Sequence, residues 1–399
     1  MRIAIISDWH LGWGFDGELG RDSFDNLKTA FLQLEKQNID LVLVPGDLFD
    51  MPCPSQDILL KAITLLNEVG LENKLGLMDN SGKTLKLPML GITGNHEYRG
   101  KDYASTLEVL EATGFVKNLK NSCERLEKEK IAIFAMPAIP EKFALSYLKE
   151  KFNPRPLPNY LNILVLHQSL KEYLPFEDEM VASISLSDLP QGFDIIINGH
   201  LHWSSVVTLP SGVVLVLPGS TVTTQVKKRE TEIEKGYFIL DTSLPKDKML
   251  EFNKIEGARK AYYISITSKK DDIKKIQENI EKELSCLEKD KERKALVRIR
   301  LQGELAEGEF TKNLNLNKIK EEYLQYFYIS IKNEIAEKNL KDSIEQLRKL
   351  QAEAKSAKEL GKEIFLEQMR QIRVSQDFDY LRLYELLENG DVKKAKELL

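Results

Sequence analysis

The sequence contains little cysteine and no long apolar run. Only three cysteines occur among 399 residues, at Cys53, Cys123 and Cys286, and no two of them form a CxxC pair. Cysteines that are odd in number and far apart exclude a disulfide framework and a thiolate metal site, and they indicate a reducing cytoplasm. No apolar stretch approaches the roughly 18 residues that a membrane helix needs, so we expect no membrane contact. Because the strand-like RIAIIS follows Met1 directly, we also expect no leader peptide.

An excess of positive charge is also missing. The 57 basic side chains are outnumbered by 62 acidic ones, which gives a net charge of −5. This balance argues against a strongly basic nucleic-acid wrapper, although bound divalent cations could neutralise part of the acidic excess. With 42% apolar residues, a chain of this length can form a large core and suggests two or three domains.

Residues 1–240 alternate between short apolar runs and helical or loop-like stretches. The runs RIAIIS, DLVLVP, LPMLGIT, KIAIFAM, NILVLH and DIIING are typical of strands buried on both faces. Apolar residues at steps of three and four predict helices over residues 22–36 and 55–68. We therefore predict an α/β fold for a first domain at residues 1–240.

The chain becomes more highly charged after residue 240. AYYISIT, a helical stretch near 270–288, ALVRIRLQG and YFYISIKN predict strand, helix, strand and strand, which suits a small α+β domain at residues 241–339. Residues 340–399 are helical in pattern, with a turn at Asn389-Gly390, and suggest a helical hairpin. A segment this short buries little surface by itself. Its apolar residues therefore either bind a partner or fold back on the core. These residues are Leu360, Ile364, Phe365, Phe378, Leu381 and Leu386.

All five histidines follow β-type apolar runs. They occur in the motifs Asp8-Trp9-His10, Gly94-Asn95-His96-Glu97 and Gly199-His200-Leu201-His202 and at His167, while Gly46-Asp47-Leu48-Phe49-Asp50 follows the second run. Loops at the carboxyl ends of strands can converge, and the glycines before Asp47, Asn95 and His200 would let the backbone turn sharply. Seven N and O donors are too many for one tetrahedral ion and suit two that share a carboxylate. These donors are Asp8, His10, Asp47, Asn95, His167, His200 and His202.

The ordered series DxH, GDxxD, GNH, H and GHxH resembles that of the calcineurin-like metallophosphoesterase superfamily. The resemblance implies a two-sheet sandwich flanked by helices. It also implies that Asp8, His10, Asp47 and His202 hold one metal, and that Asp47, Asn95, His167 and His200 hold the other. His96 would then stand over the scissile phosphate, oriented by Asp50. For Asp50 the alternative is a helix N-cap before PSQDILL.

Further segments are similar to the SbcD-type nuclease subunits of the double-strand-break repair complex. They are GDLFD with the Pro-rich MPCPS, LHQSLKEYLP, SLSDLPQGFDIIINGHLH and LPGS. The resemblance implies two Mn²⁺ ions, although the ligands alone admit Mg²⁺, Zn²⁺, Fe²⁺ or Ni²⁺. It further implies exonuclease action on duplex ends, endonuclease action on single strands, a DNA-binding capping domain, a homodimer, and a C-terminal hairpin that binds an SbcC-type ATPase. The host would be prokaryotic, and archaeal in our interpretation.

Contacts with DNA are predicted from residues beside the motifs. Trp13 and Trp203 could stack on bases, and Lys227, Lys228 and Arg229 could contact phosphates. The alternatives are that the tryptophans pack the walls of the cleft and that the basic run is a solvated loop.

Two departures from the family bear on the choice of function. Glu97 stands where aspartate is usual, and we expect it to be a solvated loop or cap residue. Met51 stands where protein phosphatases of the superfamily carry arginine, which makes a phosphoprotein substrate less favoured. The alternatives to a nuclease are a metallophosphoesterase of other substrates and a scaffold for the ATPase that does not cut DNA.

Overall fold

The computed structural model describes residues 1–14, 17–98, 103–174, 184–306, 309–336 and 380–388, with positions 391, 392, 394 and 396. The chain divides into two compact units. The first comprises Met1–Tyr263, Lys289–Arg298 and Leu324–Ile329, and the second comprises Ile264–Glu288, Ile299–Tyr323 and the described residues from Ser330 onward. Within the described ranges, no helix has the length and apolar character needed to cross a membrane.

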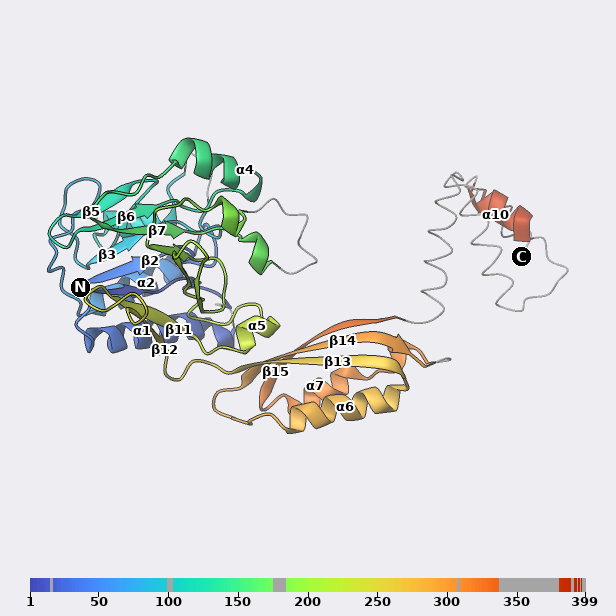
Figure 1. The fold of residues 1–399 in the computed structure, drawn as a ribbon. Coiled ribbons are helices and arrows are strands. Elements are labelled where there is room, and N and C mark those ends of the chain that lie inside the picture. The colour runs from blue at the N-terminus through green and yellow to red at the C-terminus, as the bar shows by residue number, and fades with distance from the viewer. Residues whose placement is uncertain are drawn as a thin grey trace. The chain divides into compact units, whose positions relative to one another are not determined.

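Two six-stranded sheets form the core of the first unit (Figure 1). The first sheet has the order β12 (Leu250–Lys254), β11 (Gly236–Asp241), β1 (Arg2–Ile5), β2 (Leu41–Val44), β3 (Met89–Gly91) and β4 (Lys117–Asn118). The second has the order β5 (Cys123–Leu126), β6 (Ile131–Ala135), β7 (Leu161–Leu166), β8 (Ile195–Asn198), β10 (Val214–Leu217) and β9 (Ser205–Thr208). In the first sheet β1, β2, β3 and β4 are parallel, and antiparallel pairing occurs at β11 and β12. In the second sheet the four central strands are parallel and the two edge strands are antiparallel to them.

The side chains of each parallel strand alternate between two apolar layers. Ile3 and Ile5 of β1 pack in the layer between the sheets, with Ile133 of β6 and Val165 of β7. Ala4 of β1 instead packs in the layer on the outer face of the first sheet. Strands buried on both faces therefore have continuous apolar sequences, which is why the runs are visible in the sequence.

Helices cover the outer faces of both sheets (Figure 1). Residues of α1 (Asp22–Glu35), α2 (Gln56–Glu68) and α3 (Thr106–Ala112) pack in the outer layer of the first sheet, and residues of α4 (Glu141–Ser146) in that of the second. Ser55 caps α2 by accepting the Ile58 N–H, so Asp50 is not a helix cap. The prediction of an α/β two-sheet sandwich flanked by helices is confirmed. Shorter helical elements are η1 (Glu18–Arg21), η2 (Tyr147–Phe152), η3 (Lys171–Tyr173), η5 (Leu186–Asp188) and α5 (Lys228–Thr231).

A three-stranded sheet follows, with the order β13 (Ala261–Asp271), β14 (Ala295–Leu305) and β15 (Phe327–Ala336). Helix α6 (Ile273–Ser285) lies between its first two strands in sequence and begins at the N-cap Asp272, whose side chain accepts the Lys275 N–H. The sequence pattern predicted no helix between β14 and β15, whereas the structure has η6 (Thr311–Asn313) and α7 (Leu316–Tyr323) there. The eight residues of α7 bury only Ile319, which leaves little apolar periodicity to detect.

The predicted hairpin is only partly within the described residues. Helix α10 (Tyr380–Glu388) carries Leu381, which is 41% exposed, and the half-buried Leu386. The other predicted partner-binding residues, Leu360, Ile364, Phe365 and Phe378, lie outside the described ranges. The hairpin, like the capping role of the second domain, remains a prediction.

Candidate metal centre

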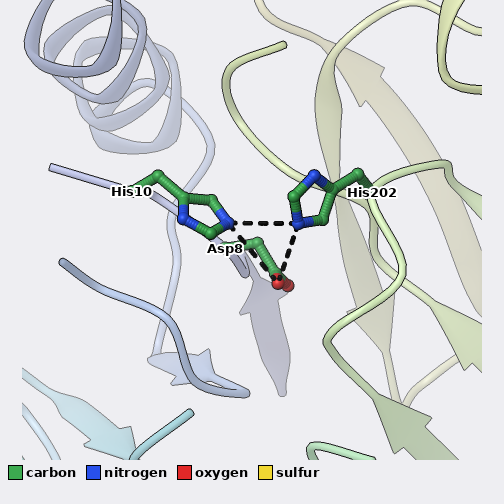
Figure 2. A group of neighbouring side chains, drawn as sticks. All are labelled: Asp8, His10 and His202. Carbon is green, nitrogen blue, oxygen red and sulfur yellow. Dashed lines mark hydrogen bonds and ion pairs between the residues drawn. The ribbon is translucent and has the colours of Figure 1, made fainter. Parts of the chain in front are cut away.

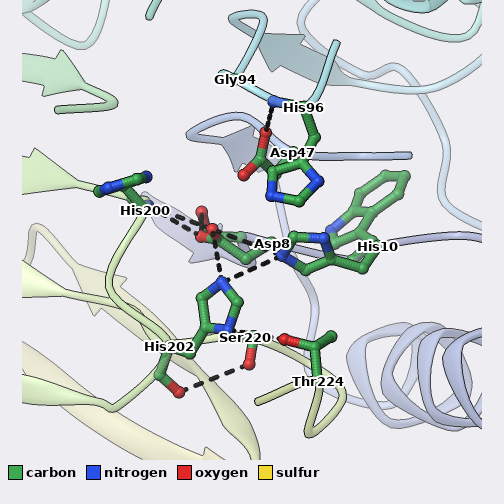
Figure 3. A network of polar contacts seen from close by, with 12 residues as sticks. Asp8, His10, Asp47, Gly94, His96, His200, His202, Ser220 and Thr224 are labelled. Carbon is green, nitrogen blue, oxygen red and sulfur yellow. Dashed lines mark hydrogen bonds and ion pairs between the residues drawn. The ribbon is translucent and has the colours of Figure 1, made fainter. Parts of the chain in front are cut away.

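Five loops that leave the carboxyl ends of parallel strands bring the predicted donors together. Figure 3 shows five of these donors, Asp8, His10, Asp47, His200 and His202. The first three motifs follow β1, β2 and β3, which are neighbours in the first sheet. His167 follows β7 and the motif Gly199–His202 follows β8, and these strands are neighbours in the second sheet. The centre therefore lies where the same ends of both sheets meet, as parallel strands require.

The first group of donors consists of Asp8, His10 and His202 (Figure 2). Nε2 of His10 lies 3.1 Å from Nε2 of His202, and these nitrogens lie 4.0 and 3.9 Å from Asp8 Oδ1. Nδ1 of His10 lies 3.1 Å from Asp50 Oδ1, which as a carboxylate only accepts, so the Nδ1 hydrogen is donated there and Nε2 keeps its lone pair. A lone pair facing a second imidazole and a carboxylate suits a cation bound among the three side chains.

The second group consists of Asp47, His167 and His200, with Asn95 beside them. His167 donates its Nδ1 hydrogen to Pro45 O at 2.6 Å, because a carbonyl can only accept. Its Nε2 then faces Asp47 Oδ2 at 3.1 Å and Asn95 Oδ1 at 3.0 Å, and His200 Nδ1 lies 2.8 Å from the same Asn95 oxygen. Acceptor atoms converge here too, which fits a second cation.

Burial and mutual charge perturb the titration of these groups in the protein without metal. Burial raises the pKa of Asp8. Burial opposes the charge of His167, but the Asp47 carboxylate outweighs it and raises the pKa of His167 to about 9. Burial, with the nearby His167, lowers the pKa of His200 to about 3. In the metal-free protein a proton on His167 supplies positive charge beside the buried carboxylates. A divalent cation would replace that proton as the source of positive charge, so this cluster of carboxylates and imidazoles suits metal binding.

Four of the predicted donor residues have strained backbones. Asp8, His10, Asp47 and His200 have φ angles of 51°, 45°, 50° and 72°, in the left-handed region that side chains with a Cβ rarely adopt. Strain of this kind costs on the order of 1–3 kcal/mol for each residue and persists where a site over-determines the conformation. The sequence-based prediction had placed the sharp turns at the preceding glycines.

The glycines serve a partly different purpose from the one predicted. Of the three motif glycines, Gly46, Gly94 and Gly199, only Gly46 has a positive φ, at +101°. A Cβ on Gly94 would overlap the Asp47 carboxylate, and a Cβ on Gly199 would lie 2.7 Å from His167 Nδ1. At Gly94 and Gly199 the missing side chain therefore provides space rather than a sharp turn, because neighbouring motifs pack directly on the backbone.

Glu97 was predicted to be a solvated loop or cap residue, and the solvated interpretation is wrong. It is 0% exposed, and its Oε1 accepts the N–H groups of Leu48 and Phe49 at 2.9 and 3.1 Å. Its Oε2 accepts the Gly94 N–H at 3.0 Å. The carboxylate thus fastens the second motif to the third. The only signal in the sequence was an acidic residue directly after the tight GNH turn, where backbone donors lack partners.

His96 belongs to neither of these two donor groups, but its ring lies beside His10 and Asp50, and the three form another set of neighbouring donor atoms. Its Nδ1 donates to Asp50 O at 2.8 Å, and its side chain is 33% exposed. The opposite ring nitrogen, Nε2, is therefore available to a substrate. Asp50 contacts both rings, since its carboxylate accepts from His10 and its carbonyl from His96.

The tryptophans and basic residues differ in their surroundings. Trp9 is fully buried and packs edge-on against Phe31, so it belongs to the core. Trp13 and Trp203 are half-buried, and the Arg229 guanidinium lies 5.5 Å from the centre of the Trp203 ring. Lys227 and Lys228 are exposed. A hollow of about 390 Å³ adjoins the second donor group, lined by residues that include Asn95, Tyr98, Ile139, Glu141, His167 and His200.

Comparisons with known proteins agree with this geometry. The calcineurin-like phosphoesterase family matches residues 1–204. The DNA double-strand break repair protein Mre11 of Sulfolobus acidocaldarius is 25% identical, over 100% of this chain and 98% of that protein. The double-strand break repair protein MRE11 of Encephalitozoon cuniculi is 31% identical over 60% of this chain, and the match spans only 45% of that protein. A subunit of the nuclease SbcCD from Staphylococcus epidermidis is 25% identical, over 64% of this chain and 72% of that protein.

A solved dimetal phosphatase from Danio rerio covers 60% of this chain and 91% of its own, at 12% identity and a TM-score of 0.37, a likeness too weak to carry an argument. The family match covers half of the chain and includes all seven predicted donors. From the sequence match and the donor groups at the strand ends together, we conclude that this chain belongs to the calcineurin-like phosphoesterase family, the metal-dependent phosphoesterases.

Proposed function

We propose that this protein is a two-metal DNA nuclease that processes double-strand breaks together with an SbcC-type ATPase. The observation that carries the proposal is the pair of adjacent donor groups, Asp8–His10–His202 and Asp47–His167–His200. The names of its relatives, double-strand break repair proteins and a nuclease subunit, support the choice of DNA as substrate.

Each donor group fits one cation. Asp8, His10 and His202 would hold one ion, and Asn95, His167 and His200 the other, with Asp47 shared between them. Two such ions, when bound, would activate a water molecule and withdraw charge from the phosphate. Mixed imidazole and carboxylate ligation admits several first-row metals, and we propose Mn²⁺ as the native one.

His96 is the proposed catalytic residue outside the metal sites. Because its Nδ1 hydrogen is donated to Asp50 O at 2.8 Å, the ring is fixed with Nε2 free. A protonated Nε2 could donate to the departing oxygen of the phosphodiester or stabilise its charge. Asp50 holds the ring in place and also contacts His10, so it would couple the orientation of the catalytic ring to that of a metal ligand.

The surroundings favour a phosphodiester over a phosphoprotein. Met51, directly after the second motif, is 38% exposed and offers no cation for the terminal phosphate of a monoester. Trp203, with Arg229 stacked on its ring, would provide a platform for a base or a phosphate, and we extend this proposal to Trp13, Lys227 and Lys228.

We propose three functional regions with the boundaries expected from the sequence. Residues 1–240 would carry the nuclease, residues 241–339 would cap it and bind DNA, and residues 340–399 would bind the ATPase. The exposed Leu381 of α10 would take part in such binding. We further propose a homodimer.

The decisive experiment compares three proteins on one set of substrates. Wild type, His96→Asn and His167→Asn are incubated with Mn²⁺ or EDTA and with end-labelled duplex DNA, circular single-stranded DNA and bis(p-nitrophenyl) phosphate. Metal content is measured in parallel. We expect wild type to cut both DNAs only with Mn²⁺, His96→Asn to keep two ions without cutting, and His167→Asn to lose an ion.

The alternatives give different patterns. Hydrolysis of the small diester with both DNAs intact would indicate a phosphoesterase of other substrates. Inactivity on all three substrates, with ATPase binding retained, would indicate a scaffold.

A further inference from the structure

A buried ion pair lies behind His202. Lys235, just before β11, is 6% exposed, and Glu230 of α5 is 2% exposed. The Lys235 ammonium lies 2.8 Å from Glu230 Oε1. Two ions removed from water are rarely favourable compared with apolar side chains of similar size, so fold stability alone gives a poor reason for this pair.

All three donors of the Lys235 ammonium are used: one contacts Glu230, one contacts the loop of His202 and one contacts the loop after β10. Besides Glu230, Nζ donates to the His202 carbonyl at 3.0 Å and to Ser220 Oγ at 2.7 Å. Ser220 also donates its own N–H to the His202 carbonyl at 3.3 Å, and its hydroxyl lies 3.4 Å from the same oxygen (Figure 3). Lys235 therefore fastens the loop that carries His202 to the loop after β10.

The loop after β10 is itself attached to the first motif. Thr221 donates its N–H to Asp8 O at 3.2 Å, and Ser220 forms a parallel β-bridge with Ser7. Through Ser220, the ammonium of Lys235 connects the backbone of Asp8 with that of His202. Asp8 and His202 are two of the three members of the first donor group, and they follow strands of different sheets.

Glu230 acts on the ring of His202 rather than on its backbone. Thr224 Oγ1 lies 3.0 Å from His202 Nδ1, and Glu230 Oε1 lies 3.7 Å from the same nitrogen. Glu230 Oε1 also accepts the Thr224 N–H at 3.3 Å, so the carboxylate holds Thr224 in place. The Thr224 hydroxyl can accept or donate, but the Glu230 carboxylate can only accept, so its place on the Nδ1 side favours hydrogen at Nδ1. The lone pair then lies on Nε2, the nitrogen that faces His10 and Asp8.

We propose that Lys235 and Glu230 are positioning residues, which fix the backbone and the ring of His202 so that its Nε2 lone pair points at the first metal ion. This inference rests on the proposed two-metal function. Polar partners of a metal-binding histidine generally fix its tautomer and ring orientation, and their loss typically weakens metal binding by about 10–100-fold. The side chains of the second donor group contact neither Lys235 nor Glu230, so we expect the larger effect at the first ion.

The test removes both charges together. Lys235→Met/Glu230→Leu leaves no unpaired ion in the core, so the fold should survive even if either single change is harmful. Lys117→Met is the matched control, because Lys117 forms a 2.8 Å ion pair with Glu124 at the sheet edges, away from the donors. Mn²⁺ affinity and stoichiometry are measured by calorimetry, and the magnetic coupling of two ions by electron paramagnetic resonance.

We expect wild type and Lys117→Met to bind two coupled ions. The double variant should bind one ion normally and the other about 10–100-fold more weakly, with the coupling lost at limiting Mn²⁺. Two ions bound by the double variant with wild-type affinity would overturn the inference.

A second measurement does not depend on metal. Long-range ¹H–¹⁵N spectra of the metal-free protein report the tautomer of each of the five histidines, assigned with single His→Asn variants. We expect hydrogen at Nδ1 of His202 in wild type and a mixture of tautomers in the double variant. An unchanged His202 signal would refute the positioning role, whereas wild type that binds no Mn²⁺ would refute the proposed function alone.

Discussion

Replacing Glu97 by alanine should destabilise the first unit, and by an amount that depends on pH. The change leaves three buried N–H groups, of Leu48, Phe49 and Gly94, without their acceptor. Each unsatisfied donor costs about 1–3 kcal/mol, and some relaxation is expected. At a pH where Glu97 of the wild type is protonated, we therefore expect Glu97→Ala to lower the free energy of unfolding by roughly 3–6 kcal/mol.

Ionisation of Glu97 should reduce that loss. Burial, and then the Asp47 charge, raise its pKa from 4.5 to about 7 in the metal-free protein. A carboxyl group whose pKa is higher in the folded state binds its proton more tightly there, so the stability it contributes falls as the pH rises from 4.5 through about 7. This shift in the pKa of Glu97 corresponds to a change of about 3 kcal/mol in the free energy of unfolding. Glu97→Ala should therefore cost about 3 kcal/mol less at about pH 8 than at about pH 5.

Urea unfolding in EDTA provides the assay, since chelation removes stabilisation by bound metal. Fluorescence follows the first unit specifically, because Trp9, Trp13 and Trp203 all belong to it. Glu97→Gln keeps one acceptor oxygen without the charge and should lie between wild type and Glu97→Ala at about pH 5. Glu68→Ala is the exposed control and should change little. An alanine variant within about 1 kcal/mol of wild type at about pH 5, or a cost independent of pH, would refute the reasoning.

Two further substitutions follow from close contacts. Gly94→Ala places a Cβ on the Asp47 carboxylate, so we expect loss of Mn²⁺ binding measured by calorimetry, while Gly76→Ala, which meets no atom within 4 Å, should retain it. Asp22→Asn removes the charge that Arg259 and Arg293 both contact, and since Asp22 is 3% exposed we expect a loss of about 3–5 kcal/mol in urea unfolding. A loss below about 1 kcal/mol at Asp22 would mean that the two arginines find other partners.

Much of the fold was predictable because its determinants are local. Strands β1, β2, β3, β7 and β8 are buried on both faces, so their apolar runs are continuous and visible in the sequence. Helix α1 begins and ends within about one residue of the range that apolar periodicity predicted. The donor residues were equally visible, because each lies in a short turn directly after a strand, and parallel strands bring such turns to one edge.

What the sequence could not determine depends on contacts between distant residues. Glu97 differs from a solvated glutamate only because Leu48 and Phe49, in another loop, direct their N–H groups at it. The ammonium of Lys235 is explained only when His202 and Ser220 are seen beside it. The sequence by itself determined which residues can bind metal, since side-chain chemistry and strand ends are local properties. The tertiary structure alone decided which buried charges hold those residues in place, because such partners lie in loops that only the folded sheets bring together, and they leave no periodic pattern along the chain.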